Sequence, residues 1–208
     1  VTAFAASAAA TSSDASATTD TSAAARAAVL AVQSIGIAAA PEIMAYARSV
    51  GAAFMYISAS HNPIGHNGFK FGLDIGGVLD GAQSARLIAL FTQKCAAAHQ
   101  DTAAVLRTQV DPAQVQAVFE AEAAHKQTAL TAYQRFLQEV IADSKDAAEQ
   151  ARFFDGIRAQ CAALSAAGKP FTLVADFNGS ARAASVDRAF FEKLGMQLVG
   201  IAENAGNI

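Results

Sequence analysis

Three residues with chemically useful side chains lie close together in the segment YISASHNPIGHNGFKFG, residues 56–72. Ser60 and His61 are adjacent, and Lys70 follows ten residues after the serine. A serine hydroxyl is a weak nucleophile at neutral pH and needs a base, a cation or a metal beside it. A fixed lysine charge suits phosphoryl transfer, because that reaction depends mainly on positioning and charge stabilisation.

The same segment is also rich in residues that form turns. Asn62-Pro63 and Asn67-Gly68 are turn-forming pairs, and loops of this composition are common and usually inert. A single histidine after a strand is more often a structural residue than a catalyst, and a single lysine is more often solvated. From the residues alone two interpretations are open: a structural turn, or a rigid loop that presents a serine for chemistry.

Two short strands are expected to position this loop. FMYIS, residues 54–58, is aromatic and β-branched, and FKFGL, residues 69–73, returns as a second strand. Such a return brings the Lys70 ammonium back towards the serine. Upstream, residues 23–33 favour a helix, and SIGI predicts a strand that is followed by a helix from Pro41.

Downstream of the loop, apolar residues recur every three to four positions, which predicts helices. One helix is expected within residues 81–99, a long one from Asp111 onwards, and another within residues 147–165. Asp111 has the place of an N-cap, because a proline follows it at the first helical position. Gly168-Lys169-Pro170 interrupts the helical pattern, and a domain boundary is expected there.

Residues 168–208 show a strand-helix-strand alternation in which the helix covers residues 183–194. Alternation of this kind predicts a parallel α/β sheet, with functional loops at the carboxyl ends of strands. Ser60 and Asn178 both follow such strand ends. We therefore expect an α/β fold with a mixed, mostly parallel sheet sandwiched by helices in residues 1–167, followed by the beginning of a second similar domain.

Composition and charge exclude several classes of protein. The chain is 53% hydrophobic and 16% charged, which excludes a disordered, solvating chain. Its formal charge is −3 and its pI about 5.8, so no nucleic-acid partner is expected. Because it has neither a run of about 18 apolar residues nor the basic start of a signal peptide, we expect no membrane association and a cytoplasmic location. Cys95 and Cys161 are expected to be buried free thiols.

SASHNPIGHNGFK resembles the active-site loop of the α-D-phosphohexomutases, the family of phosphoglucomutase, phosphomannomutase and phosphoglucosamine mutase. The family pattern is Thr/Ser-Ala/Gly-Ser-His-Asn-Pro, a few variable residues, and then Asn-Gly-Phe/Tyr-Lys, and every fixed element is present. TTDTS and GIAAAPEI extend the resemblance upstream, and LVADFNGSARAASVDRAFFEKLG is similar to the opening of the family's second domain. Residues 100–165 match only as generic helix.

The resemblance implies a defined reaction, the interconversion of hexose 1-phosphate and hexose 6-phosphate through a bisphosphate intermediate. Ser60 would carry the phosphoryl group, and Lys70 and His61 would act as acid/base and charge-stabilising groups. Asn62 and Asn67 would contact the hexose phosphate substrate. Mg²⁺ would bind an oxygen of the phosphoryl group on Ser60, and hexose 1,6-bisphosphate would serve as the activator.

The sequence also departs from the family pattern. The Asp-x-Asp-x-Asp-Arg loop that supplies the family's three aspartate ligands for Mg²⁺ is absent from the 208 residues, and Ser22 replaces an arginine. We therefore expect the chain to be an incomplete part of such an enzyme that does not convert hexose phosphate by itself. The alternative is a non-catalytic relative that keeps the loop for phosphosugar binding or regulation.

Overall fold

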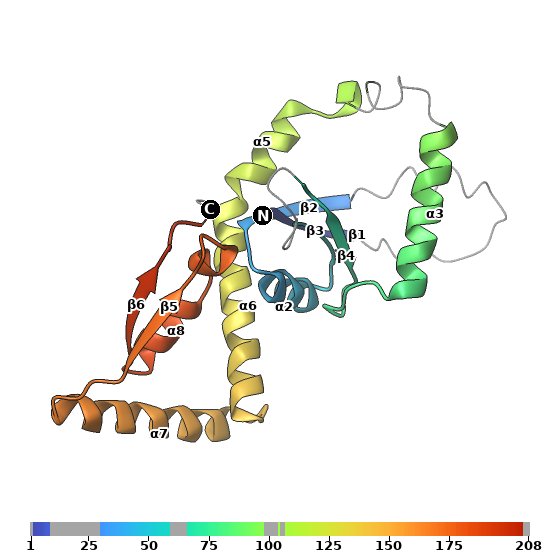
Figure 1. Cartoon of the computed structure of the whole chain (residues 1–208). Helices are drawn as coiled ribbons and strands as arrows, with labels where there is room; N and C mark the ends of the chain where they lie inside the picture. The colour runs from blue at the N-terminus through green and yellow to red at the C-terminus, as the bar shows by residue number, and fades with distance from the viewer. Residues whose placement is uncertain (1, 9–29, 59–65, 98–103, 105–106, 206–208) are drawn as a thin grey trace.

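In its described part, the chain forms an α/β structure with two small sheets and long helices (Figure 1). It is seen in a computed structural model, which describes residues 2–8, 30–58, 66–97, 104 and 107–205. None of the helices in these ranges combines the length and the apolarity needed to cross a membrane. Both cysteines are free, but only Cys161 is buried, whereas Cys95 is exposed, contrary to expectation.

A four-stranded sheet forms the N-terminal part. Its strands lie in the order β2 (Leu30–Ile37), β1 (Thr2–Ala8), β3 (Ala53–Ile57) and β4 (Phe69–Gly72). All three neighbouring pairs are antiparallel. Helix α2 (Ala40–Val50) carries the chain from β2 back to β3, so these two strands run in the same direction, with β1 between them.

The prediction of a mostly parallel sheet is wrong for this sheet. It rested on a strand-helix-strand order, and β2, α2 and β3 do follow that order, but the two strands are not neighbours. Strand β1, which lies in the alanine-rich start of the chain, pairs with both of them and makes each contact antiparallel. The helix predicted for residues 23–33 is wrong over its described part, because β2 already begins at Leu30.

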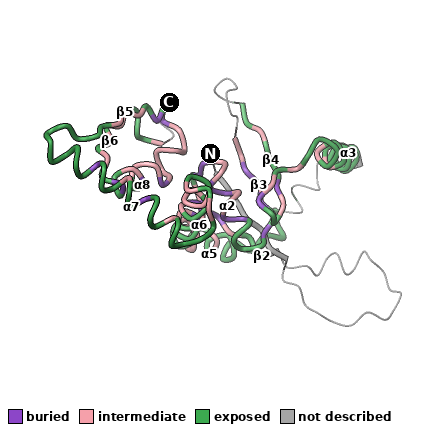
Figure 2. The backbone as a smooth tube through the Cα atoms, turned by 90° about the horizontal axis from the view of Figure 1, so that it is seen from below, coloured by how far each residue is buried: buried purple, intermediate pink, exposed green. Residues whose placement is uncertain are grey.

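The core lies between the sheet and helices α2 and α6 (Glu122–Ala142). Figure 2 shows buried segments in the sheet and in α2, whereas α3 (Gly81–Ala97) and α5 (Pro112–Glu120) are exposed over most of their length. Helix α2 ends where Gly51 adopts a left-handed conformation, with φ of 62°. The core cluster consists of Ile35, Ala38, Ile43, Tyr46, Ala47, Ala52, Phe54, Tyr56 and Ala129.

The predicted N-cap at Asp111 is confirmed. Its carboxylate accepts a hydrogen bond from the backbone N–H of Ala113 at 2.9 Å, which satisfies one of the free amides at the start of α5. The long helix expected from this point is instead two successive helices. Helix α5 ends at Glu120 and α6 begins at Glu122, with Ala121 as the link between them.

The C-terminal part is a parallel strand pair with one helix, as predicted. Residue 168 lies in the turn after α7, and the predicted helix over residues 183–194 is divided into a 3₁₀ turn and a shorter α-helix. Helix α7 (Ala147–Ala166) precedes this part, whose elements are β5 (Thr172–Asp176), η1 (Ala181–Ala184), α8 (Asp187–Lys193) and β6 (Gln197–Ile201). Strands β5 and β6 pair in parallel.

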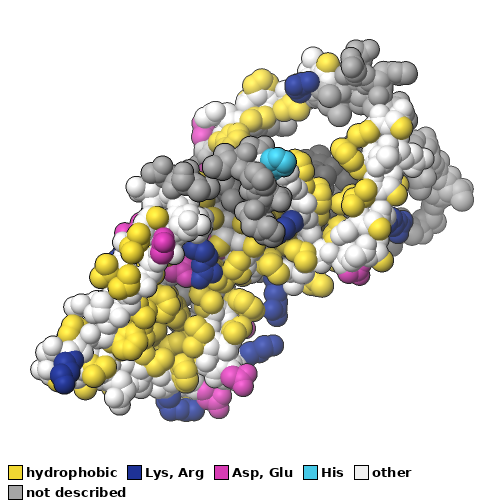
Figure 3. Space-filling model, viewed as in Figure 1, with side chains coloured by type: hydrophobic (Ala, Val, Ile, Leu, Met, Phe, Trp, Pro, Cys, Tyr) yellow, Lys and Arg dark blue, Asp and Glu magenta, His cyan; other side chains and the backbone are white. Residues whose placement is uncertain are grey.

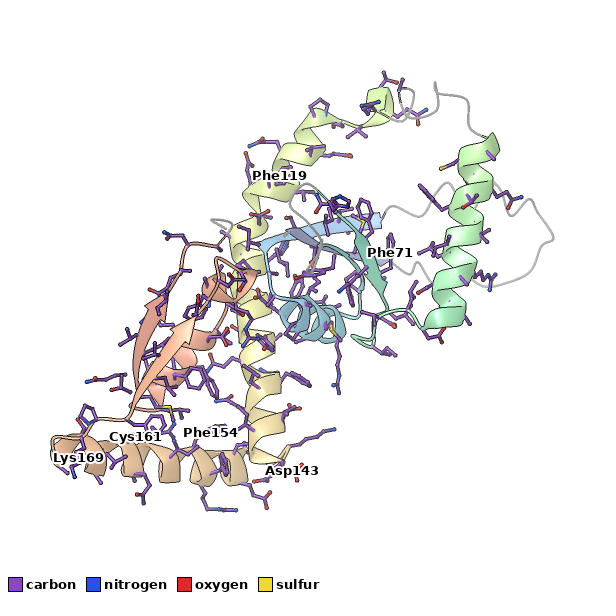
Figure 4. All side chains as sticks on the ribbon, viewed as in Figure 1. Phe71, Phe119, Asp143, Phe154, Cys161 and Lys169 are labelled. Atoms are coloured by element: carbon purple, nitrogen blue, oxygen red, sulfur yellow. The ribbon has the colours of Figure 1, made fainter. Side chains whose placement is uncertain are left out.

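Apolar side chains hold this C-terminal part on the helices before it. Phe154 of α7 meets Phe190 of α8 edge to face, with ring centroids 5.9 Å apart, and Leu194 completes the buried cluster. Leu137 of α6 packs against its margin. Figure 4 shows Phe154 and Cys161 on the side of α7 that faces the strand pair. Helices α6 and α7 therefore form the platform on which the C-terminal part rests.

Candidate active site

The predicted active-site loop connects β3 with β4, which form an antiparallel hairpin. Tyr56 lies opposite Lys70 in this hairpin. One step beyond the strands, the backbone N–H of Ser58 donates to the carbonyl oxygen of Gly68 at 2.9 Å. The two ends of the loop are therefore held together at its base, and the two predicted strands and their return are confirmed.

The predicted site residues divide into two groups. Asn67 and Lys70 are described and both are exposed, Asn67 before β4 and Lys70 within it. Ser60, His61 and Asn62 lie outside the described residues. Their roles, including the metal contact through a phosphoryl group on Ser60, stay predictions.

A buried tyrosine anchors the stem of this loop. Tyr56 lies on the same face of the sheet as its partner Lys70, and its hydroxyl donates to the carbonyl oxygen of Ala38 at 3.2 Å. Burial raises the pKa of the Tyr56 phenol, a hydrogen bond with Ser58 lowers it, and the carboxylate of Glu42 raises it further. Because the net change is a rise, the phenol stays protonated and can donate this hydrogen bond throughout the neutral range.

Strand β4 ends at a glycine because the ring of Phe54 crosses it. A Cβ atom on Gly72 would lie 2.0 Å from Cε1 of Phe54 and 2.7 Å from the carbonyl oxygen of Gly77. Neither distance leaves room for a methyl group, so glycine allows the ring to stay in the core. This close packing fixes β4, the strand after the loop, against β3, the strand before it.

The completely buried carboxylate of Glu42 lies near the turn between β2 and α2. Oε1 of Glu42, at the start of α2, is 2.5 Å from Nζ of Lys126 on α6. The lysine also donates to the carbonyl oxygen of Ile37 at 2.6 Å, and the Ser185 hydroxyl donates to Oε2 of Glu42 at 3.0 Å. Both carboxylate oxygens are therefore satisfied, as a buried charge requires.

The sequence contains a signal for this carboxylate that was missed. Glu42 lies on the face of α2 that also carries Ile43, Tyr46 and Ala47, and all four residues are buried. A carboxylate on an otherwise apolar helix face predicts a buried polar partner. Its place in the first turn also suits a negative charge, because the amino end of a helix carries a partial positive charge.

The opposite face of the hairpin borders an apolar groove of about 680 Å³. Figure 3 shows hydrophobic side chains on both sides of the space between β4 and α3, and Figure 4 shows Phe71 on the strand at its edge. Lys70 lies between the groove residues Phe69 and Phe71, so the groove runs along the strand that follows the predicted loop, although Lys70 itself shares the other face of the sheet with Tyr56. Its main apolar residues are Met55, Phe69, Phe71, Leu87, Ile88 and Phe91.

Comparison with known families bears on the segment that contains the loop. Residues 11–97 match the family model described as phosphoglucomutase/phosphomannomutase, alpha/beta/alpha domain I. These residues are therefore similar to domain I of the phosphohexomutases. The match includes β2, α2, β3, β4, α3 and the whole predicted loop, and it covers less than half of the chain. The chain has no match among curated proteins.

Over residues 11–97, the resemblance first carried by the loop motif is confirmed. The family is one of isomerases. In the described part of the chain, no group of three or more His, Cys, Asp or Glu side chains could hold a metal ion. The described residues therefore do not fit a Mg²⁺ site by themselves.

Proposed function

We propose that the chain is the serine-carrying part of a phosphohexomutase that interconverts hexose 1-phosphate and hexose 6-phosphate. The main support is the family match over residues 11–97 together with the complete motif from Ser58 to Lys70 on a hairpin that is closed at its base. Residues 168–208 are proposed as the beginning of a second α/β domain. Their parallel β5–β6 pair and α8 support that reading.

Ser60 carries the phosphoryl group in this proposal. The bond from phosphorus to the serine oxygen breaks while a bond to the free hydroxyl of the hexose phosphate forms. The neutral His61 imidazole accepts the hydroxyl proton, and the Lys70 ammonium stabilises the transferring charge and donates a proton to the departing serine oxygen. Transfer back to Ser60 from the other end of the bisphosphate completes the exchange. Asn62 and Asn67 hydrogen-bond the substrate, and the exposed position of Lys70 on β4 leaves its ammonium accessible to a phosphoryl group.

Mg²⁺ and hexose 1,6-bisphosphate belong to the proposal as cofactor and activator. A divalent cation neutralises charge on the transferring phosphoryl group. The described residues offer no cluster of acidic ligands for it, so the proposal has the ion bound through the phosphoryl group on Ser60. The bisphosphate charges an unmodified Ser60 by donating one phosphoryl group and leaving as hexose monophosphate.

The proposal is tested by incubating the full chain with hexose 1,6-bisphosphate and Mg²⁺ and measuring its intact mass. We expect the mass to rise by one phosphoryl group in the unmodified protein and not in Ser60→Ala. Ser58→Ala is the matched control, because it removes a hydroxyl two residues away, and it should still be phosphorylated.

Two results would contradict the proposal. Phosphorylation that persists in Ser60→Ala would place the carrier elsewhere. A wild-type chain that binds hexose phosphate, measured by calorimetry, but never becomes phosphorylated would favour the phosphosugar-binding or regulatory alternative, which needs the loop but not the transfer.

A further inference from the structure

Glu42 connects three parts of the chain that are far apart in the sequence. Its carboxylate lies at the start of α2, its ion-pair partner Lys126 lies on α6, and its second partner Ser185 lies in the C-terminal part, between η1 and α8. The carboxylate is completely buried, so it cannot exchange these partners for water. A buried charge that loses a partner is strongly unfavourable, so both contacts are held firmly.

A second polar contact fixes the same segment of the C-terminal part. The Arg182 guanidinium donates to the Tyr133 hydroxyl at 2.7 Å and also pairs with Asp187. Burial by itself lowers the pKa of Arg182, but Asp187 and Tyr133 outweigh burial and the net pKa is raised, so the side chain stays charged. Figure 1 shows η1 against α6 at the level of α2, where these contacts lie.

The Glu42 cluster also reaches the stem of the predicted loop. Lys126 donates to the carbonyl oxygen of Ile37, and Tyr56 of β3 donates to the carbonyl oxygen of the next residue, Ala38. The two donors therefore hold consecutive peptide groups of the turn between β2 and α2. The Glu42 carboxylate is also close enough to Tyr56 to raise the pKa of its phenol.

We propose that Glu42 is a positioning residue that couples the placement of the C-terminal part, residues 168–205, to the stem of the loop between β3 and β4. The route runs from Ser185 through Glu42 and Lys126 to the turn after β2, and from that turn to Tyr56. The coupling itself is a property of the fold, and its consequence for catalysis rests on the proposed function.

The apolar contacts of the C-terminal part do not perform this role. The cluster of Phe154, Phe190 and Leu194 holds α8 on α7 and α6, and none of its residues lies in the four-stranded sheet. Apolar contact is also non-directional, whereas a hydrogen bond to a buried carboxylate fixes both distance and orientation. The polar contact therefore sets where the C-terminal part lies relative to the loop stem.

The coupling is tested by hydrogen-exchange mass spectrometry on the full chain. Ser185→Ala removes the link from the C-terminal side and leaves the Glu42–Lys126 pair intact. We expect about fivefold faster amide exchange in residues 177–187 and also in residues 53–58 and 66–72, a factor equivalent to about 1 kcal/mol for one lost hydrogen bond. Ser185→Thr keeps the hydroxyl and should restore slow exchange in all three segments.

Thr172→Val is the matched control, because it removes a hydroxyl of the C-terminal part whose hydrogen bonds, to Pro170 and Gln197, stay within that part. It should leave exchange in residues 53–58 and 66–72 unchanged. If Ser185→Ala accelerates exchange only within residues 168–205, the coupling is overturned and the contact is merely local. Glu42→Gln provides a second check, since adding Ser185→Ala to it should have a smaller effect than in the wild type.

Phosphorylation of Ser60 by hexose 1,6-bisphosphate is measured on the same variants. A slower reaction in Ser185→Ala that Ser185→Thr restores would show that the coupling reaches the reaction, and an unchanged rate would overturn that consequence. If the wild type never becomes phosphorylated, the proposed function fails, but the exchange data still decide whether the coupling exists.

Discussion

The two faces of the four-stranded sheet differ sharply. On one face, α2 and α6 cover the sheet and bury Ile35, Phe54 and Tyr56 in a continuous core. On the other face, Phe69 and Phe71 border the groove between the sheet and α3. Both faces carry large apolar side chains, yet only the first has removed them from water.

The two faces of the sheet therefore have different roles in the structure. The α2 face contributes most of the apolar burial in the sheet and satisfies its buried polar groups, so it holds the stem of the predicted loop in place. The α3 face leaves about 680 Å³ of accessible space along β4, the strand that carries Lys70. A rigid face that supports an open one is a common arrangement for a binding site.

The comparison is tested most severely at Phe54, which is 4% exposed. Phe54→Ala should lower the free energy of unfolding by about 3–5 kcal/mol, because it leaves a cavity in the core on the α2 face. Urea denaturation followed by circular dichroism measures this loss. A loss below about 1 kcal/mol would mean that the α2 face does not carry the stability assigned to it.

Gly72→Ala tests whether β4 is packed as tightly as the structure shows. The added methyl group would lie within the ring of Phe54 and against the carbonyl oxygen of Gly77, so we expect a loss of about 1–3 kcal/mol from overpacking. Gly81→Ala is the control, because nothing lies within 4 Å of a Cβ atom at that position. Equal unfolding midpoints for the two variants would contradict the packing of Phe54 across β4.

Tyr56→Phe tests the hydrogen bonding on the face of the sheet that α2 and α6 cover. Loss of the hydrogen bond to Ala38 should cost about 1 kcal/mol near neutral pH. The pKa of Tyr56 is raised in the folded state, so the stability that its protonated phenol contributes is complete below about pH 10 and is lost as the pH rises through the folded pKa. The difference between wild type and Tyr56→Phe should therefore shrink above about pH 10.

The measurement is a series of urea titrations between neutral and strongly alkaline pH. Tyr46, whose pKa burial also raises, remains in both proteins, so its contribution cancels in the difference. A difference that stays constant or grows with pH would rule out a protonated, buried Tyr56.

Phe71, which is 38% exposed, should show the smallest effect. Phe71→Ala should cost no more than about 1 kcal/mol, because little apolar surface is recovered from water on the open face. Differential scanning calorimetry against Phe54→Ala gives the comparison directly. If both variants lose similar stability, α3 closes over the sheet in solution and the two faces are equivalent.

The sequence was most informative where the signal is local. The hairpin from β3 to β4 and the cap at Asp111 followed from turn residues, apolar patterns and an Asp-Pro pair within a few positions of one another. Lys70 was placed on the returning strand for the same reason. The loop motif also led to the family that residues 11–97 match.

The sheet order and the cluster around Glu42 were not predicted. The spacing of apolar residues shows which face of an element is buried but not which element covers it. Strand β1 contains no turn residue or apolar pattern that predicts its position between β2 and β3. Glu42 could have been noticed as a carboxylate on an apolar helix face, but its partners Lys126 and Ser185 lie 84 and 143 residues away.

The sequence by itself determined the local elements of this protein and the chemistry that its loop can offer, because hydrogen bonds between near neighbours and side-chain type decide both. Only the tertiary structure decided which face of the sheet is covered by α2 and α6 and which carboxylate is buried near the stem of the loop. Those features depend on contacts between distant segments, and such contacts form only when the chain is packed.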